Sequence, residues 1–276
     1  MINTFVFNNE SETVRFIQLT DSHLFKHATE ELLGINTQRS FEQVLTEIQS
    51  SPFNYEFILA TGDLVQDSSP EGYSRFCQGI NTLDKMTFWI AGNHDFQPCM
   101  DEWLNEKQAN LSPKKHILAG KYWQILLLDS QVYGVPHGEL GQYQLDWLQM
   151  KLAEYPDRHS LIVLHHHLLS THSAWLDQHN LRNAEQLADL LAPFKNVKGI
   201  LHGHIHQQVD DIWNGYPIMA TPSTCVQFKP DNNDFCLDLL QPGWREIELH
   251  SDGRIETQVK RIQHVEFLPN LQLAGY

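Results

Sequence analysis

The 276-residue sequence contains few cysteines, no long apolar run and little positive charge. Its four cysteines, Cys77, Cys99, Cys225 and Cys236, form no C-x-x-C pair, which argues against a redox dithiol or a structural zinc knuckle. The longest aliphatic runs have four residues, ILLL and LIVL, far below the ~18 needed to span a bilayer. The first ten residues also lack the pattern of a secretion signal. We therefore expect a cytoplasmic protein with reduced cysteines and no membrane partner.

The charge balance argues against a further class of partner. Nineteen Lys and Arg residues stand against 34 Asp and Glu residues, which gives a formal net charge of −15, and no run of basic residues occurs. Such a chain is poorly suited to bind a nucleic acid polymer. No Pro-, Gly- or Ser-rich linker interrupts the sequence, so we expect a single domain over residues 1–276. The sequence gives no indication of an oligomeric state.

Short apolar segments alternate with helical patterns along the first three quarters of the chain. The expected strands are residues 14–20, 56–61, 87–92, 122–129, 160–167 and 197–203. Four helices are expected: one capped near Asn36 or Thr37 with Phe41, Val44, Leu45 and Ile48 on its apolar face; a weaker one over 70–84; one with Leu140, Tyr143, Trp147, Leu148 and Leu152; and one with Ala184, Leu187, Ala188 and Leu191. Periodicity also places Trp89 in the core. This alternation predicts an α/β protein with a parallel or mixed sheet.

From about residue 207 the pattern changes to short segments of alternating polarity. Turn signals occur at Asn214-Gly215 and Asp252-Gly253. We expect antiparallel strands over 207–262 that extend the sheet or form a second one.

Polar side chains capable of binding metal follow five of the six expected strands. They are Asp21-Ser22-His23, Gly62-Asp63, Gly92-Asn93-His94-Asp95, His165-His166-His167 and Gly203-His204-Ile205-His206. Open α/β sheets bind ligands at the carboxyl ends of their strands, so these residues should meet at one edge. Each signal alone is weak, because a single His after a strand is usually an ordinary polar residue, but five in order indicate a common site.

The residue types favour two divalent cations. Asp, His and Asn without thiolate suit zinc, manganese, iron or cobalt. Seven candidate ligands would serve two ions if one carboxylate bridges them: Asp21, His23, Asp63, Asn93, His165, His204 and His206. Gly62, Gly92 and Gly203 precede ligands where the chain must bend and approach the site closely.

The five-block pattern D-x-H, G-D, G-N-H-D, H and G-H-x-H over residues 21–206 resembles the calcineurin-like metallophosphoesterases. The segments SAWLDQHNLRNA, TPSTCVQFKP and PGWREIELHSDG further resemble the bacterial 3′,5′-cyclic AMP phosphodiesterases, so the resemblance covers nearly the whole chain. It implies a four-layer αββα sandwich of two mixed sheets. It also implies one ion held by Asp21, His23, Asp63 and His206, and another held by Asp63, Asn93, His165 and His204.

The same resemblance implies an activity. The chain would hydrolyse 3′,5′-cyclic AMP to 5′-AMP by in-line attack of a hydroxide that bridges the two ions, with iron or manganese favoured as metals and zinc or cobalt possible. Asn93 and His94 would be catalytic, with His94 facing the leaving group. The substrate would contact His23, Asp63, Asn93, His94 and His206. The alternatives are another specificity, for 2′,3′-cyclic nucleotides, glycerophosphodiesters or phosphoprotein, and a non-catalytic interaction module on the same fold.

Further expectations concern the surroundings of the site. Carboxylates should orient the ligand imidazoles, with Asp67 and Asp95 as candidates and helix capping or solvation as the equally plausible reading. Candidates to hold the base are Trp175, His179, Arg182, Phe228 and Lys229, although ordinary packing is the better expectation for each one. His165 is preferred as a ligand over His166 and His167 because it is closest to the strand end. Leu168 stands where these enzymes commonly have proline, which leaves the shape of this loop open.

Overall fold

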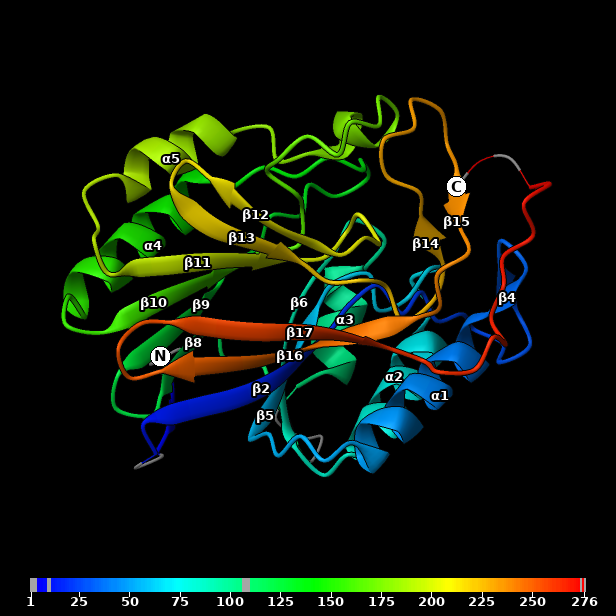
Figure 1. The fold of residues 1–276 in the computed structure, drawn as a ribbon, viewed down its shortest axis with the longest axis horizontal. Helices are drawn as coiled ribbons and strands as arrows, with labels where there is room; N and C mark the ends of the chain where they lie inside the picture. Colours follow the sequence, from blue (N-terminus) through cyan, green and yellow to red (C-terminus); the bar gives the residue numbers. More distant parts are fainter. Residues whose placement is uncertain (1–3, 9–10, 106–109, 274, 276) are drawn as a thin grey trace.

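Two mixed β-sheets lie face to face in the computed structural model, which describes residues 4–8, 11–105, 110–273 and 275 (Figure 1). The seven-stranded sheet has the order β1 (Thr4–Phe7), β8 (His116–Ala119), β9 (Trp123–Leu127), β10 (His159–Val163), β11 (Val197–His202), β13 (Tyr216–Ala220) and β12 (Val209–Trp213). The six-stranded sheet has the order β17 (Ile255–Arg261), β16 (Gly243–His250), β2 (Thr13–Leu19), β5 (Phe57–Thr61), β6 (Met86–Ile90) and β7 (Leu111–Ser112).

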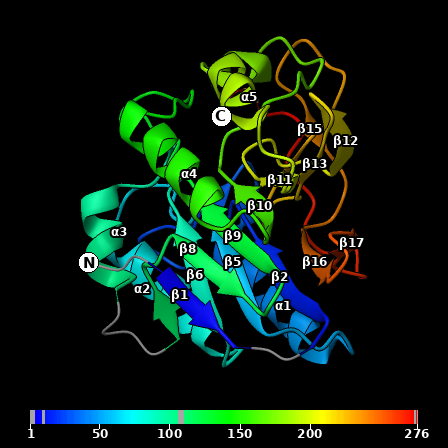
Figure 2. The same cartoon turned by 90° about the vertical axis from the view of Figure 1, so that its left-hand side faces the viewer.

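Helices cover the outer face of each sheet, as Figures 1 and 2 show from two directions. The six-stranded sheet carries α1 (Thr37–Ser50), α2 (Pro70–Asn81) and α3 (Gln97–Trp103), and the seven-stranded sheet carries α4 (Gln142–Glu154) and α5 (Ala184–Leu191). The layers are therefore α, β, β and α, and the expected four-layer sandwich is confirmed.

The four layers arise because successive apolar side chains of the central strands point to opposite faces of their sheet. In β2, Phe16 faces the apolar cluster between the sheets, whereas its neighbour Ile17 faces the cluster under α1 and α2. In β10, Leu161 likewise faces the partner sheet, and Ile162 faces the cluster under α4 and α5. Because successive side chains of a strand point to opposite faces, a strand with apolar residues at every position must be covered on both sides.

The four expected helices form, but α2 ends at Asn81 rather than at 84, and Leu140 lies just before α4. A fifth helix, α3, was not expected. Asn36 caps α1 by accepting a 2.9 Å hydrogen bond from the amide of Arg39, and Ser69 caps α2. Tyr143 does not lie on the apolar face of α4: its side chain is 79% exposed. The helix begins only at Gln142, and its buried stripe is Leu145, Leu148 and Leu152. Trp89 is buried as expected, and Trp147 is partly buried against the cluster under α4 and α5.

The segment after residue 207 adds one antiparallel hairpin to each sheet. β12 and β13 turn at Asn214-Gly215 and join the seven-stranded sheet through β11, whereas β16 and β17 turn near Gly253 and join the other sheet through β2. The remaining short strands form two small pairs, β3 (Glu31–Leu32) with β4 (Ile35–Asn36) and β14 (Gln227–Phe228) with β15 (Leu237–Asp238). Among the described residues, no helix has both the length and the apolarity to cross a membrane.

Candidate metal centre

The five polar segments expected to meet do so at one edge of the sandwich. β2, β5 and β6 run parallel to one another, and so do β10 and β11 in the facing sheet. The loops that follow these five strands carry all the candidate ligands to the same end of the molecule, as is usual for open α/β sheets.

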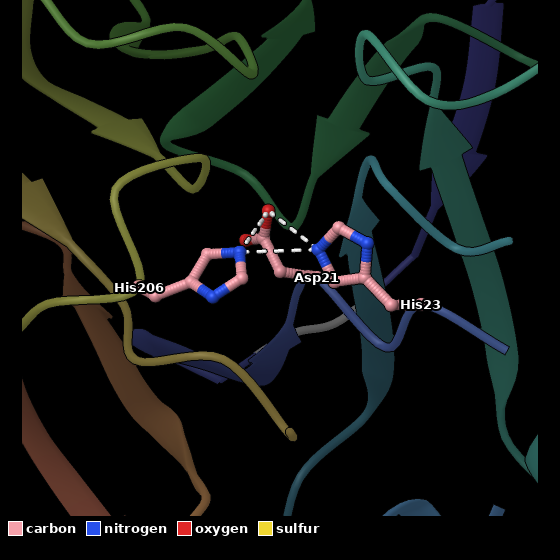
Figure 3. Close-up of side chains that lie close together, drawn as sticks. All are labelled: Asp21, His23 and His206. Atoms are coloured by element: carbon pink, nitrogen blue, oxygen red, sulfur yellow. Dashed lines mark hydrogen bonds and ion pairs between the residues drawn. The ribbon is translucent and has the colours of Figure 1, made fainter. Parts of the chain in front are cut away.

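The first group of side chains consists of Asp21, His23 and His206 (Figure 3). The Nε2 atoms of the two imidazoles lie 3.1 Å apart, and Oδ1 of Asp21 lies 3.4 Å from Nε2 of His206 and 4.0 Å from Nε2 of His23. All three side chains are buried. Three atoms with lone pairs therefore converge on one small space from two loops, the one after β2 and the one after β11.

The second group consists of Asp63, His165 and His204. Nε2 of His165 lies 3.2 Å from Oδ2 of Asp63 and 3.2 Å from Nδ1 of His204. The side-chain oxygen of Asn93 is 3.3 Å from the same nitrogen. Asp63 also clusters with His23 and His94, with potential ligand atoms within 4.8 Å of one another. The carboxylate of Asp63 therefore lies between the two groups.

Tight backbone turns bring these side chains together. Five of the candidate ligands have positive φ angles: Asp21 (55°), His23 (45°), Asp63 (50°), His204 (72°) and His206 (51°). Non-glycine residues rarely adopt this left-handed region, and such strain concentrates at functional sites. The glycines expected to permit close approach do so: a Cβ on Gly92 would collide with Asp63, and one on Gly203 would collide with Thr20 and Asp21.

Neutral oxygen atoms fix the orientation of three of the ligand imidazoles. Nδ1 of His23 pairs with Oε1 of Gln66 at 2.6 Å, that of His165 with the carbonyl of Thr61 at 2.7 Å, and that of His206 with the carbonyl of Val226 at 2.9 Å. These oxygens accept a hydrogen bond from the N–H at Nδ1. The lone pair of each Nε2 atom is therefore directed into the site. The expectation that Asp67 and Asp95 would orient the imidazoles is therefore wrong.

Those two carboxylates hold the loops instead. Asp95, fully buried, accepts hydrogen bonds from the amides of Leu64, Val65 and Gly92 and from the hydroxyl of Tyr73. Burial and the nearby charge of Asp63 raise the pKa of Asp95 to about 7. Asp67 accepts hydrogen bonds from the amides of Ser69 and Lys26 just before α2 and is exposed, which matches a solvated loop residue, because Ser69 is the cap of α2.

The electrostatics of the two groups differ from those of isolated side chains. Burial alone would raise the carboxylate pKa values, but attraction to the imidazoles holds the pKa of Asp63 well below 3.8 and also lowers that of Asp21. Burial lowers the pKa of His23 to about 3 and that of His204 well below 6.5. For His165 burial acts in the same direction, but the charge of Asp63 outweighs it and raises the pKa to about 9. The result is a negative potential around Asp63 that favours positive charge.

These donors fit divalent metal ions. Ligand atoms about 2.0–2.2 Å from one cation lie roughly 3.0–3.5 Å from one another in tetrahedral or octahedral geometry. Five of the six separations given above, 3.1–3.4 Å, fall in this range, and the sixth, between Asp21 and His23, is 4.0 Å. Among the described residues, Nε2 of His204 is buried without a hydrogen-bond partner, and Nδ1 is the atom that faces His165. The absence of thiolate suits iron, manganese, zinc or cobalt rather than a structural zinc site.

The rings of His166 and His167 pack against the ring of His204. Nδ1 of His166 pairs with the hydroxyl of Ser130 at 2.8 Å, and its ring centroid lies 4.8 Å from that of His204. The ring of His167 stacks on His204 at 5.4 Å with an interplanar angle of 18°. Leu168, which stands in place of proline, is buried in the cluster under α4 and α5. Neither of these two histidines belongs to a candidate ligand group among the described residues.

A cavity of about 340 Å³ opens beside the two groups. Of the residues expected to contact substrate, Asp63, Asn93 and His94 line it, whereas His23 and His206 lie behind in the first group. Of the five candidates for the base, Trp175, His179 and Phe228 line the cavity, whereas Arg182 and Lys229 are exposed and are not among its lining residues. Residues 134–136 also line the cavity; they were not expected from the sequence because nothing in GVP itself indicates a ligand-binding residue.

The sequence matches the calcineurin-like phosphoesterase family over residues 14–208, the region that contains all five motif blocks. The chain therefore belongs to this family of metal-dependent phosphoesterases. In a solved structure of the same general fold, a dimetal phosphatase from Danio rerio, the similarity has a TM-score of 0.60 at 13% identity and covers 91% of this chain and 99% of that one. At this identity the likeness concerns the fold alone.

Two relatives extend the similarity along the whole chain. The 3′,5′-cyclic adenosine monophosphate phosphodiesterase CpdA of Haemophilus influenzae is 62% identical over 276 residues, which is 100% of both chains. The protein of the same name from Escherichia coli K12 is 51% identical over 263 residues, 95% of each chain. The similarity therefore includes the C-terminal hairpins that lie beyond the family match.

Proposed function

We propose that this chain is a 3′,5′-cyclic AMP phosphodiesterase that converts its substrate to 5′-AMP. The observation that carries the proposal is the full-length similarity to proteins of this name, at 62% and 51% identity. The two buried clusters of Asp and His side chains supply the metal-binding site that such a phosphoesterase needs. Hydrolysis would lower the concentration of an intracellular messenger, which favours a cytoplasmic location.

Two divalent ions are proposed for the site. Asp21, His23, Asp63 and His206 would hold one, and Asp63, Asn93, His165 and His204 the other, with Asp63 shared. When bound, such ions make water a stronger nucleophile near neutral pH and stabilise negative charge on phosphoryl oxygens. Iron or manganese is favoured, with zinc or cobalt as alternatives, because imidazole and carboxylate ligands accept all four.

Side chains that line the cavity would protonate the leaving group and position the phosphoryl group. Water adds to phosphorus, the bond from phosphorus to the 3′ oxygen breaks, and that oxygen must gain a proton as it leaves. His94 lines the cavity, and its ring centroid lies 5.2 Å from that of His23, close to where phosphorus would sit. We assign His94 as the donor of that proton and Asn93 as a residue that positions the phosphoryl group.

We further infer that residues 1–276 form one domain. β13 and β16 lie inside their sheets rather than at the edges, so the C-terminal hairpins complete the sandwich that carries the site.

The substrate assignment is tested by turnover of a phosphoester panel with purified, metal-loaded protein. The panel contains 3′,5′-cyclic AMP, a 2′,3′-cyclic nucleotide, a glycerophosphodiester and a phosphopeptide, and elemental analysis identifies the metals. We expect the highest kcat/KM for 3′,5′-cyclic AMP, with 5′-AMP and not 3′-AMP as product. A higher kcat/KM for a glycerophosphodiester would overturn the assignment but leave the metal site intact.

A further inference from the structure

An unbroken row of aromatic rings connects the two candidate metal groups outside the coordinating atoms. The ring of Phe228 stacks on His206 with centroids 4.3 Å apart and an interplanar angle of 10°. The ring of Trp175 makes edge-to-face contacts with Phe228 and His179, with centroid distances of 5.1 Å and 6.1 Å. The centroid of His179 in turn lies 6.3 Å from that of His204. We call Phe228, Trp175 and His179 the aromatic arc. The arc begins at a ligand of the first group and ends at a ligand of the second.

The aromatic arc also forms one wall of the cavity described above. The loop between β9 and α4 also lines the cavity, through Val135 and Pro136, and so do Asp63, Asn93 and His94 from the candidate metal groups. The volume of about 340 Å³ lies at the lower end of the range of small-molecule sites. A molecule with its phosphate at the metal groups would extend between an aromatic wall and an aliphatic wall.

Trp175 is held rigidly in this wall. It precedes a 3-10 helix, Leu176–His179, and its amide donates a 3.2 Å hydrogen bond to the carbonyl of Asn233. Phe235 packs against the indole at 5.1 Å. Asp177 ties this helix to the loop after β10 by accepting from the amide and hydroxyl of Thr171 at 2.7 and 2.8 Å. Trp175 and His179 are partly buried, whereas Phe228 is 1% exposed, so Trp175 offers a ligand more surface than Phe228 does.

The chemistry of the two ends of the cavity differs. The metal end suits an anion, whereas the far end is formed by aromatic and aliphatic side chains. We propose that the aromatic arc, with Val135 and Pro136 from the same cavity, binds the purine base, and that Trp175 determines specificity for nucleotides over other phosphodiesters. This inference rests on the proposed function and adds a base-binding subsite to it. Stacking on an aromatic side chain strengthens binding of a base by about 10- to 100-fold.

A purely structural role predicts something else. If the arc only braces His206 and His204, loss of Trp175 would disturb metal binding and weaken every phosphate ligand equally. If it binds the base, only ligands that carry a base would be affected. The pair 5′-AMP and ribose 5-phosphate separates the two explanations, because they share the sugar and the phosphate and differ in the base.

The experiment measures inhibition constants of 5′-AMP and ribose 5-phosphate for metal-loaded wild type, Trp175→Ala and Trp175→Phe, with metal content determined for each. Arg182→Ala is the matched control, since Arg182 belongs to the same segment but lies outside the lining. We expect wild type and the control to prefer 5′-AMP by about 10- to 100-fold. Trp175→Ala should lose most of this preference with an unchanged constant for ribose 5-phosphate and unchanged metal content, and Trp175→Phe should retain most of it.

Two outcomes would overturn the inference: an undiminished preference in Trp175→Ala, or equal weakening of both ligands accompanied by metal loss. If Trp175→Ala does not fold, Val135→Gly tests the same subsite through another lining residue, and the preference for 5′-AMP should fall severalfold. An unchanged preference there would count against the subsite. Failure of wild type to hydrolyse 3′,5′-cyclic AMP refutes the proposed function, whereas hydrolysis with an intact preference in these variants refutes only this inference.

Discussion

The backbone amide of His94 donates a 2.8 Å hydrogen bond to Oδ1 of Asp63. The carboxylate that we propose to be shared by the two metal sites is thereby bonded directly to the residue proposed to protonate the leaving group. Gly92, two residues earlier, has no room for a Cβ against the same carboxylate. The loop after β6 therefore packs closely against the carboxylate of Asp63. Any shift of the loop would move this carboxylate.

Replacing His94 should impair chemistry without removing the metals. We expect His94→Ala to lower kcat for 3′,5′-cyclic AMP by about 10²- to 10⁴-fold, the usual contribution of a general acid. The loss should be much smaller for a p-nitrophenyl phosphodiester, because that leaving group needs no proton. His27→Ala, a change at an exposed histidine, serves as the control. Unchanged kcat in His94→Ala with full metal content would refute the assigned role.

Replacing Asp63 should affect both metals at once. Asp63→Asn keeps the shape but removes the charge that lies between the two groups, so we expect metal content to fall in both sites and kcat/KM to drop by at least about 10³-fold. Elemental analysis after dialysis checks the first expectation. The matched change Asp67→Asn, at an exposed carboxylate outside the groups, should leave metal content near two per chain. Loss of a single metal in Asp63→Asn would contradict the bridging position.

The sequence was sufficient for the features that depend on local pattern. His165 and His204 follow continuous apolar strands, and in parallel strands that fact alone predicts convergence at one edge. Apolar residues at consecutive positions of a strand likewise predict that both faces of the sheet are covered. In the structure Phe16 faces one apolar cluster and Ile17 faces another.

Features that depend on tertiary contact were not predictable from one sequence. Gln66 orients His23, but a single glutamine after a strand has no distinguishing signal, and the other two acceptors are backbone carbonyls that every residue possesses. Tyr143 fits a helical period but lies too near the start of α4 to reach the sheet. Residues 134–136 form a cavity wall only because the loop folds toward Trp175.

Adding a methyl group at Gly203 should disrupt the first metal group. A Cβ there would overlap Oγ1 of Thr20 and lie 2.7 Å from Oδ2 of Asp21. We expect Gly203→Ala to lower the free energy of unfolding by about 1–3 kcal/mol and to weaken metal binding, since both atoms are buried and closely packed. Gly141→Ser is the control, because nothing lies within 4 Å of its Cβ position and serine is a favoured helix cap. Urea unfolding measures the free energy of unfolding of both variants. Equal values for Gly203→Ala and Gly141→Ser would contradict the prediction.

Removing Arg245 should weaken the joint between the two C-terminal hairpins. This fully buried guanidinium donates to Oδ1 of Asp210, to the carbonyls of Val209 and Ala220, and to the hydroxyl of Thr257. We expect Arg245→Met to cost about 2–4 kcal/mol, because buried acceptors lose their donor. The exposed Arg254, changed to Met in parallel, should cost under about 0.5 kcal/mol. A stability for Arg245→Met equal to that of Arg254→Met would show that the buried network is dispensable.

His116 should make stability depend on pH, far from the metal groups. Nε2 of its ring donates to Oε1 of Gln124 at 3.0 Å and Nδ1 accepts from the hydroxyl of Thr4 at 3.0 Å, an arrangement that uses the neutral imidazole. Burial lowers the pKa of His116 from 6.5 to about 4. The unfolded chain therefore binds the proton more readily, so the stabilisation is complete above pH 6.5 and is lost as pH falls toward 4.

A difference measurement isolates this contribution from the carboxylates that titrate in the same range. Between pH 7.5 and 4.5, we expect the free energy of unfolding of wild type to fall by about 1–2 kcal/mol more than that of His116→Asn. His159→Asn provides the comparison, since the His159 ring is only partly buried and pairs with the carbonyl of Ser251. Identical pH dependence of wild type and His116→Asn would mean that His116 is protonated equally in the folded and unfolded chains, despite its burial against Trp147 and Tyr155 under α4.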